Sequence, residues 1–473
     1  MRKRTVLGMV AVGGALAMNA VLRRGAGGGT ARPATGLPTM SLSDTLAFLT
    51  DVGLPNLAKG VIKRRKRVVG AAEAADLDRR AVCRMQQLHE KYGPGPALLK
   101  IPVRNQAVIF EPEDGWRVLE QTPEPFSPAS SEKKAALGHF QPHGALISEG
   151  AERAERRRFN DDVLESGCPI HSLTESFARA VQEETEELFR SIAAEGELDW
   201  DAFSNAWFRV VRRVVFGEGA RGDVELRRMV DELRYDANWA FLKPRDKRLR
   251  KAFLERVRHH LRRAGAGSLA ERIAEAPKNE STKPEHQVPQ WLFAFDPAGM
   301  ATYRALGLLA AHPDQLARAR FEADVARATH DRGLPFIRAS ILEALRLWPT
   351  TPLILRQTTS ETRWATGVLP AGAGVAIFAP FFHRDDRQLP FANRFAPDIW
   401  SEDPPMDGWP LVPFSAGPGV CPGQHVALLL GSLFIARLIE GHQVRLSEPE
   451  RLNPDELPGT FDHYSMRYRL LSG

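Results

Sequence analysis

The stretch Phe414-Ser415-Ala416-Gly417-Pro418-Gly419-Val420-Cys421-Pro422-Gly423 decides the fold prediction. It places one cysteine at the end of a glycine-rich turn, directly before the apolar run 426–436. Pro422 has the fixed φ preferred at a first helical position, so we expect a buried helix from about Pro422 to Ile439. Cys421 then lies at or near the N-cap, where backbone N–H groups favour the thiolate. Such a thiolate can bind a metal, although a Gly/Pro turn with an inert buried cysteine has the same form.

The glycines of this turn have separate expected roles. Gly417 lets the chain turn tightly, and Gly423 removes a side chain that would keep a flat macrocycle away from the helix. Phe414 is expected to cover the sulfur. The pattern Phe-x-x-Gly-x-x-x-Cys-x-Gly resembles the haem-ligand loop of cytochrome P450s, in which the cysteine is the axial thiolate. The resemblance implies haem b as cofactor, held by Phe414, Gly417, Cys421 and Gly423, with Cys421 as the ligand of iron.

A second resemblance lies upstream, in the segment Ser340–Pro349. It is predicted to be a helix closed by proline, with Glu343 and Arg346 one turn apart and able to pair. This is similar to the structural Glu-x-x-Arg motif of the P450 K helix, although such a pair can also be a solvated helix pair. The segment 351–359 then resembles the strand that passes the haem edge, and Arg356 falls where the family often places an arginine on a haem propionate.

Two further segments agree with this order. The basic run 150–159 resembles the C helix of the family, where Arg153 and Arg157 would meet propionates across one turn; the alternative is a solvated or partner-binding face. The dipeptide His312-Pro313 matches the end of the I helix, and short strands are expected near residues 98–110. The resemblance covers about residues 70 to 470 and implies a mainly α fold with small β-sheets, the cytochrome P450 fold.

The sequence departs from the family pattern at two scaffold positions. Gly419 stands two residues before the cysteine, where the family usually has a basic residue on a propionate. Ile399 stands where the family usually supplies an arginine to the Glu-x-x-Arg pair, and Arg394 or His383 are the candidates to replace it. One anchoring charge and one partner of Glu343 are therefore missing from the pattern.

A third departure bears on chemistry. In the place of the oxygen-activation motif of the I helix, Asp296 holds the acid position and Pro297 stands where a threonine usually supplies a hydroxyl. We expect a broken helix here, because proline removes an N–H and clashes with the carbonyl of Phe293. Asp296 is the candidate for proton delivery, and Thr302 lies too far along to replace the hydroxyl. Alternatively, Asp296 is an N-cap and Pro297 begins a second helical half.

Composition limits the other functions. The 473 residues carry a net charge of +6 and three cysteines, so a disulfide framework is not expected and Cys83 and Cys168 are predicted to be buried. Basic runs at 63–67, 156–158 and 243–251 favour an acidic lipid surface or an acidic electron-transfer protein. Nucleic acid is not expected, because no binding motif accompanies the charge. Electrons are expected from a separate donor, such as a ferredoxin and its reductase.

Three regions are predicted along the chain. Residues 1–24 are a basic and apolar segment that serves as a membrane anchor, an export signal or a tail, residues 25–69 are a linker and basic region, and residues 70–473 are the haem domain. The predicted location is cytoplasmic, with membrane association through the first segment.

The resemblance also implies a substrate region, which includes the strand from Pro352 and the turn near Phe461. Most of its side chains are apolar, which favours a lipophilic small molecule. The predicted function is a haem-thiolate monooxygenase that inserts one oxygen atom from O2. A peroxygenase or isomerase that bypasses ordinary oxygen activation, and a non-catalytic haem-binding protein, are the alternatives. The candidate substrate contacts are Trp239, Phe293, Ala294, Ala298, Leu353 and Ile354.

Overall fold

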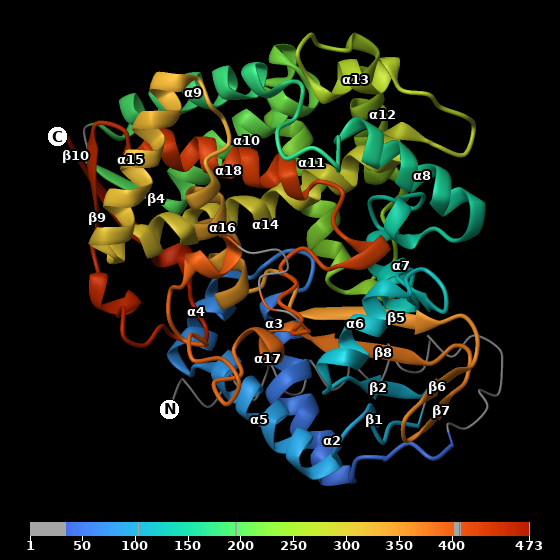
Figure 1. Ribbon diagram of the computed structural model, residues 1–473. Coiled ribbons are helices and arrows are strands. Elements are labelled where there is room, and N and C mark those ends of the chain that lie inside the picture. The colour runs from blue at the N-terminus through green and yellow to red at the C-terminus, as the bar shows by residue number, and fades with distance from the viewer. Residues whose placement is uncertain (1–34, 103, 194–195, 402–405, 407, 473) are drawn as a thin grey trace.

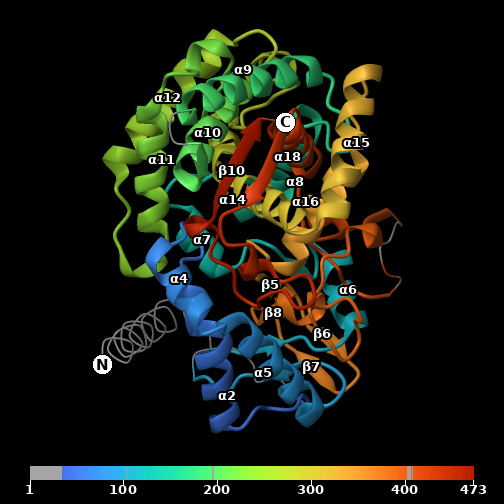
Figure 2. The same cartoon turned by 90° about the vertical axis from the view of Figure 1, so that its left-hand side faces the viewer.

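The computed structural model describes residues 35–472 apart from 103, 194–195, 402–405 and 407. Helices fill one half of the molecule, and a small sheet with the N-terminal helices forms the other half (Figure 1). A view turned by 90° shows the same division, with α2 and α5 at the end opposite α9 and α12 (Figure 2). The predicted fold class, mainly α with small sheets, is confirmed. The predicted segment 1–24 lies outside the described residues.

The helical half is organised around α14, which crosses the middle of the molecule (Figure 1). Side chains of α10, α14, α16 and α18 form the larger of two main hydrophobic clusters. Helix α18 is apolar on nearly all sides, which is expected of a helix enclosed by others. The helices of this half are α8 Gly150–Val163, α9 Thr174–Ile192, α10 Trp200–Phe216, α11 Val224–Ala237, α12 Lys247–Arg263, α13 Leu269–Glu275, α14 Pro284–Ala311, α15 Pro313–Thr329, α16 Pro335–Leu347 and α18 Gln424–Ile439.

The main sheet has five strands in the order β1-β2-β8-β5-β3. Strands β2 and β8 are parallel and the other pairs are antiparallel. All five residues of β8 are buried, as expected for a central strand, and β5 alternates between half-buried and buried residues. The strands are β1 Ala97–Leu98, β2 Gln106–Val108, β3 Phe126–Ser127, β5 Leu353–Thr358 and β8 Gly374–Phe378, and the short helices near them are α6 Pro112–Glu120, α7 Ser131–Leu137 and α17 Ala379–His383.

Two small sheets complete the strands. One has the order β4-β10-β9 and connects the helical half to the C-terminal region, and the other is the pair β6-β7. Their bounds are β4 Glu197–Asp199, β9 His442–Leu446, β10 Arg467–Ser472, β6 Thr362–Trp364 and β7 Gly367–Leu369.

The region predicted as a linker, residues 25–69, differs from the prediction where it is described. Met40, Phe48 and Val52 are buried in the hydrophobic cluster that surrounds the main sheet. Residues from 37 onward therefore belong to the folded body, because their apolar side chains complete the cluster beside the sheet. The helices of this region are α2 Leu42–Phe48, α3 Leu54–Lys59, α4 Lys66–Ala74 and α5 Leu77–Tyr92, with the π-helical turn η1 Leu49–Gly53 between α2 and α3.

The structure corrects two further expectations. Cys83 on α5 and Cys168 after α8 were predicted to be buried, and both are exposed. Helix α18 begins at Gln424 with Gly423 as N-cap, two residues later than predicted, and ends at Ile439 as predicted. No helix within the described residues is both long and apolar enough to cross a membrane.

Candidate active site

The loop before α18 holds Cys421 through backbone hydrogen bonds. The N–H of Cys421 donates to the carbonyl of Phe414 at 2.9 Å, and the N–H of Val420 donates to the carbonyl of Gly417 at 3.0 Å. Gly417 has a φ of +59°, and a Cβ atom there would lie 2.6 Å from the carbonyl oxygen of Leu119. The tight turn therefore requires glycine both for its left-handed conformation and for the close approach of α6.

Cys421 lies deep in the protein but is not fully enclosed. The residue is only half-buried by surface, yet burial raises the pKa of its thiol above the usual value. A hydrogen bond from the N–H of Gly423 and the charge of Arg157 act in the opposite direction and lower that pKa. A Cβ atom built on Gly423 would meet Leu164 Cδ1 at 3.8 Å, which is an ordinary van der Waals contact. A thiol deep in the protein with free surface is suited to bind a metal once it loses its proton.

Arg157 supports the loop directly. Its Nη1 donates to the carbonyl of Val420 at 2.7 Å, and its Nε pairs with Asp161 on the same helix at 2.7 Å. The sequence predicted a propionate contact for Arg157. The structure places this arginine behind the cysteine loop, where it stabilises the loop backbone and the charge of the thiolate.

Three other cations gather near the loop: Arg153 on α8, Arg356 on β5 and Lys133 on α7. Arg356 Nη1 and Lys133 Nζ both donate to the carbonyl of Leu355, at 3.1 and 3.0 Å, and Arg356 Nη2 lies 3.4 Å from Ser415 Oγ in the cysteine loop. Burial and, to a smaller extent, the charge of Arg153 lower the pKa of Arg356 to about 10.

These cations lack a counter-ion. Within the described part of the chain, neither Arg153, Lys133 nor Arg356 forms an ion pair with a carboxylate, whereas their neighbours Lys134 and Arg157 do. Burial, followed by the charge of Arg356, lowers the pKa of Lys133 well below its usual range, although the residue keeps free surface. Buried charges are costly unless they are paired, so this arrangement favours an anionic ligand. The sequence did not predict Lys133 as a site residue. The signal that could have indicated this role was its position in a helix before the basic run.

The glycine at position 419 is explained by Arg356. A Cβ atom on Gly419 would lie 2.9 Å from Arg356 Nη2, so the guanidinium occupies the space that a side chain of residue 419 would need. The charge that the family pattern supplies from the loop is thus supplied from the strand, with Lys133 beside it.

The Glu343–Arg346 pair is buried, with both side chains 0% exposed, which excludes the solvated helix pair. Arg346 donates from Nε and Nη2 to the two carboxylate oxygens of Glu343 at 2.7 and 2.6 Å. The indole N–H of Trp400 donates to Glu343 at 3.0 Å and takes the place of the missing arginine. Of the two predicted substitutes, Arg394 and His383, each contributes only its carbonyl, which accepts from Arg346.

Helix α14 presents one half-buried face. The residues that remain partly exposed recur at intervals of three and four, as expected for one side of a helix, and include Phe293, Ala294, Pro297 and Ala298. On another side the indole N–H of Trp207 donates to the carbonyl of Phe295 at 2.8 Å. Three observations thus fit a bound haem: the free thiol surface, this open face of α14 and the unpaired cations.

The prediction of a broken helix at Asp296 is wrong. Helix α14 continues through Pro297 from Pro284 to Ala311, so Asp296 is not an N-cap. Its carboxylate, 4% exposed, accepts from Arg234 of α11 at 2.5 Å and lies 3.7 Å from Lys63. Burial alone would raise the pKa of Asp296, but Lys63 and Arg234 lower it to about 2. Packing of α11 and of the segment around Lys63 therefore holds the helix together and keeps Asp296 ionised.

The other residues predicted to contact the substrate lie in different surroundings. Phe293 packs against Phe140 at 5.9 Å between ring centroids and lies under the guanidinium of Arg234. Ile354 is two residues from Arg356 on the same face of β5, whereas Leu353 points to the opposite face. Trp239 is 41% exposed after the end of α11 and packs against Arg65, so it lies at the surface.

Comparison with known proteins agrees with this geometry. The family model for cytochrome P450 matches residues 285–464. Over 159 residues the chain is 33% identical to methyltetrahydroprotoberberine 14-monooxygenase of Papaver somniferum, covering 31% of this chain and 30% of that protein. Over 215 residues it is 30% identical to cyclooctat-9-en-7-ol 5-monooxygenase of Streptomyces melanosporofaciens, covering 42% and 47%. The matched segments span less than half of these relatives.

Solved structures share the fold over most of the chain. The retinoic acid-bound cyanobacterial CYP120A1 matches with a TM-score of 0.66 at 18% identity, covering 82% of this chain and 94% of that one. A zebrafish cytochrome P450 with progesterone matches with a TM-score of 0.62 at 18% identity, covering 77% and 92%. Residues 285–464 thus match the cytochrome P450 family, the chain has the fold of its solved members, and this family implies a haem cofactor.

Proposed function

We propose that the protein is a haem-thiolate monooxygenase that inserts one oxygen atom from O2 into a lipophilic small molecule. The observation that carries this proposal is Cys421, a half-buried residue deep in the protein whose loop contacts Arg356, one of three cations that lack a counter-ion. The monooxygenase names of the related sequences support the reaction class. Electrons come from a separate protein, for which a ferredoxin with its reductase is the proposed type.

The residues of the chain divide the work of holding haem b. Cys421 binds the iron through Sγ, while the N–H of Gly423 and the charge of Arg157 stabilise the thiolate. Arg356, Arg153 and Lys133 hold the two propionates, since these cations are close together and unpaired. When bound, the thiolate-ligated iron supplies the oxygen activation of this family. The carbonyl of Phe414 holds the backbone N–H of Cys421, and the half-buried residues Phe293, Ala294 and Ala298 of α14 would line the opposite face.

Proton delivery is the step in which this chain departs from its family pattern. Pro297 carries no hydroxyl, and the hydroxyl of Thr302 donates to the carbonyl of Ala298 at 2.9 Å and is buried. A carboxylate with a pKa of about 2 holds no proton at neutral pH, so Asp296 relays protons only when its contact with Arg234 opens. These features favour a second candidate, a haem-thiolate enzyme that uses peroxide or isomerises its substrate without O2.

The central test is replacement of Cys421 by alanine, with Cys168→Ala as the matched control at an exposed cysteine. The reduced, carbon monoxide-bound protein is expected to show the red-shifted Soret band of thiolate haem in the wild type and in the control, and to lose it in Cys421→Ala. A folded wild type without that band would overturn the assignment.

The two candidate reactions are separated by Pro297→Thr. The added hydroxyl is expected to raise the fraction of electrons that reach product in assays with O2 and an electron donor. If the wild type turns over with peroxide and the variant does not improve coupling with O2, the second candidate holds instead. The matched control is Thr302→Val, which removes a hydroxyl that is already bonded to Ala298 and is expected to leave coupling unchanged.

A further inference from the structure

A cavity of about 190 Å³ lies between α4, α5, the C-terminal half of α14, the end of α16 and the turn 457–463. Among the described residues, none of those proposed to hold the haem lines it. Pro352 and Phe461, which belong to the expected substrate region, form part of its wall, so the cavity borders that region. Nothing in the haem site accounts for the charged residues that surround this cavity.

Five cations line this cavity: Lys59, Arg64, Arg79, Arg304 and Arg384. Arg79 forms ion pairs with Asp76 and Glu456, and Lys59 pairs with Asp78 at 2.5 Å. In the part of the chain that the structure describes, Arg64, Arg304 and Arg384 form no ion pair with a carboxylate. Their guanidinium groups are held mainly by neutral acceptors, so about three positive charges remain without a counter-ion.

Arg64 and Arg304 are the cations best placed to bind a ligand. Arg64 donates to the carbonyls of Gly60 at 3.0 Å and Thr350 at 2.8 Å and keeps free surface, although burial lowers its pKa. Arg304, 8% exposed, donates to the carbonyl of Trp348 at 2.9 Å, and its Nε has no partner among the described residues. A charged residue that is deep in the protein and still has accessible surface lines an internal space.

The rest of the wall is apolar. Val69, Val82, Leu347, Trp348 and Phe461 face the same cavity as the cations. The volume is below the range of about 300–1,000 Å³ that drug-sized ligands occupy, which limits the ligand to a small molecule. A free inorganic anion would satisfy the arginines but would leave the apolar side chains without a contact.

We propose that this cavity binds a small organic carboxylate, with its charged group on Arg64 and Arg304 and its apolar body against Trp348 and Phe461. The carboxylate supplies the missing negative charge, and planar guanidinium groups match its two oxygens. The proposal stands on the cavity and its charges and does not depend on the proposed monooxygenase reaction.

Cys83 gives a direct readout, because it lines the cavity and is exposed, while Cys168 is exposed elsewhere in the same molecule. The full-length protein is treated with iodoacetamide, and alkylation is followed by peptide mass analysis at increasing octanoate. Octanoate is expected to protect Cys83 and to leave the alkylation of Cys168 unchanged. Octan-1-ol, which has the same body without the charge, is expected to give no protection.

The variant Arg64→Gln is expected to raise the octanoate concentration for half-protection of Cys83 by roughly tenfold, the size of one lost charge-assisted hydrogen bond. The matched control is Arg65→Gln, since Arg65 donates to the carbonyls of Leu57 and Ala58 and does not line the cavity. Equal protection by octanol or by inorganic phosphate would overturn the carboxylate assignment. A Soret shift with octanoate while Cys83 stays unprotected would also overturn it, because the ligand would then occupy the haem site alone.

Discussion

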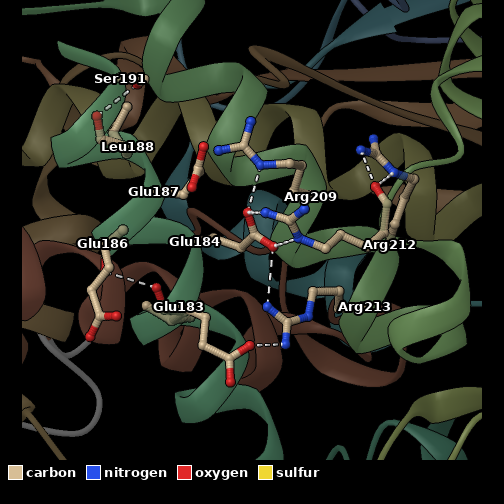
Figure 3. Close-up of polar contacts among 12 residues, drawn as sticks. Glu183, Glu184, Glu186, Glu187, Leu188, Ser191, Arg209, Arg212 and Arg213 are labelled. Carbon is tan, nitrogen blue, oxygen red and sulfur yellow. Dashed lines mark hydrogen bonds and ion pairs between the residues drawn. The ribbon is translucent and has the colours of Figure 1, made fainter.

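Two groups of charged residues in the molecule differ in one respect. Around Glu184 of α9, which is 0% exposed, three arginines converge on one carboxylate. Arg209 lies at 2.5 Å and Arg213 at 3.1 Å (Figure 3), and Arg221 lies at 2.5 Å. Around Arg356, the cations Arg153 and Lys133 converge, and none of the three forms an ion pair with a carboxylate among the described residues. The first group is complete within the chain, and the second lacks its anion.

The difference shows how a structural cluster can be told from a binding site. A buried charge that its own chain neutralises contributes to the folded state at all times. A buried charge that the chain leaves unpaired costs stability until a ligand arrives. Substitutions in the two groups should therefore change the stability of the haem-free protein in opposite directions.

Replacement of Glu184 by glutamine is expected to have the largest effect. Burial alone would raise the pKa of Glu184, but hydrogen bonds from Arg221 and Arg209 lower it below the usual value. The cluster therefore contributes stability above the unfolded carboxyl pKa, and this contribution is lost as the pH falls through the folded pKa. At neutral pH we expect a loss of about 2 kcal/mol in the free energy of unfolding, measured in urea, with haem binding unchanged.

The control for this prediction is Glu186→Gln, which changes an exposed carboxylate two residues along the same helix and should alter stability little. If Glu184→Gln were as stable as this control at neutral pH, the cluster would not be the stabilising unit that its geometry indicates.

Arg356→Met should have a smaller effect of the opposite sign. Removal of a buried, unpaired cation is expected to leave the haem-free protein as stable as the wild type or up to about 1 kcal/mol more stable. The same change should speed the transfer of haem to an acceptor protein by roughly tenfold, because one propionate partner is lost. Arg363→Met, an exposed arginine on β6, is the control. A destabilised haem-free variant that retains haem normally would show that Arg356 is structural.

Lys133→Met should have the smallest effect, visible mainly as a change in pH dependence. Burial and the charge of Arg356 lower the pKa of Lys133 in the haem-free protein, and a neighbouring propionate would raise it again. Haem binding should then take up protons, so haem affinity falls as the pH rises through the range in which the free lysine loses its proton. This slope should disappear in Lys133→Met and persist in Lys134→Met, which changes a lysine paired with Glu149. An unchanged slope in both variants would exclude Lys133 from the site.

Local signals in the sequence predicted the parts of the fold that depend on neighbouring residues. The helix with Glu343 and Arg346, the end of α14 before Pro313 and the strand that carries Arg356 all follow from spacing and proline positions. The cysteine loop was also predicted, including the tight turn at Gly417. Contacts between residues that are a few positions apart can be inferred from the order of residues in the sequence.

The missed features depend on partners far apart in the sequence. Trp400 reaches Glu343 across 57 positions, Arg234 reaches Asp296 across 62, and Lys133 reaches Leu355 across 222. The expected break at Pro297 failed for the same reason, since tertiary contacts with α11 hold a helix that local rules would interrupt. No pattern of neighbouring residues indicates such pairs.

The crossing of α14 and α18 has a mechanical consequence. A Cβ atom on Gly431 would lie 2.6 Å from Thr302 Oγ1 and 2.8 Å from Ile341 Cδ1, so side chains of α14 and α16 pack directly onto the backbone of α18 at this glycine. The residues proposed to enclose the haem lie toward the N-terminal ends of both helices, at Pro297 and Cys421. Gly431 therefore sets how closely α14 and α18 approach each other. A single methyl group at residue 431 would change the separation of the two helices at the proposed haem site without altering any residue that contacts the cofactor.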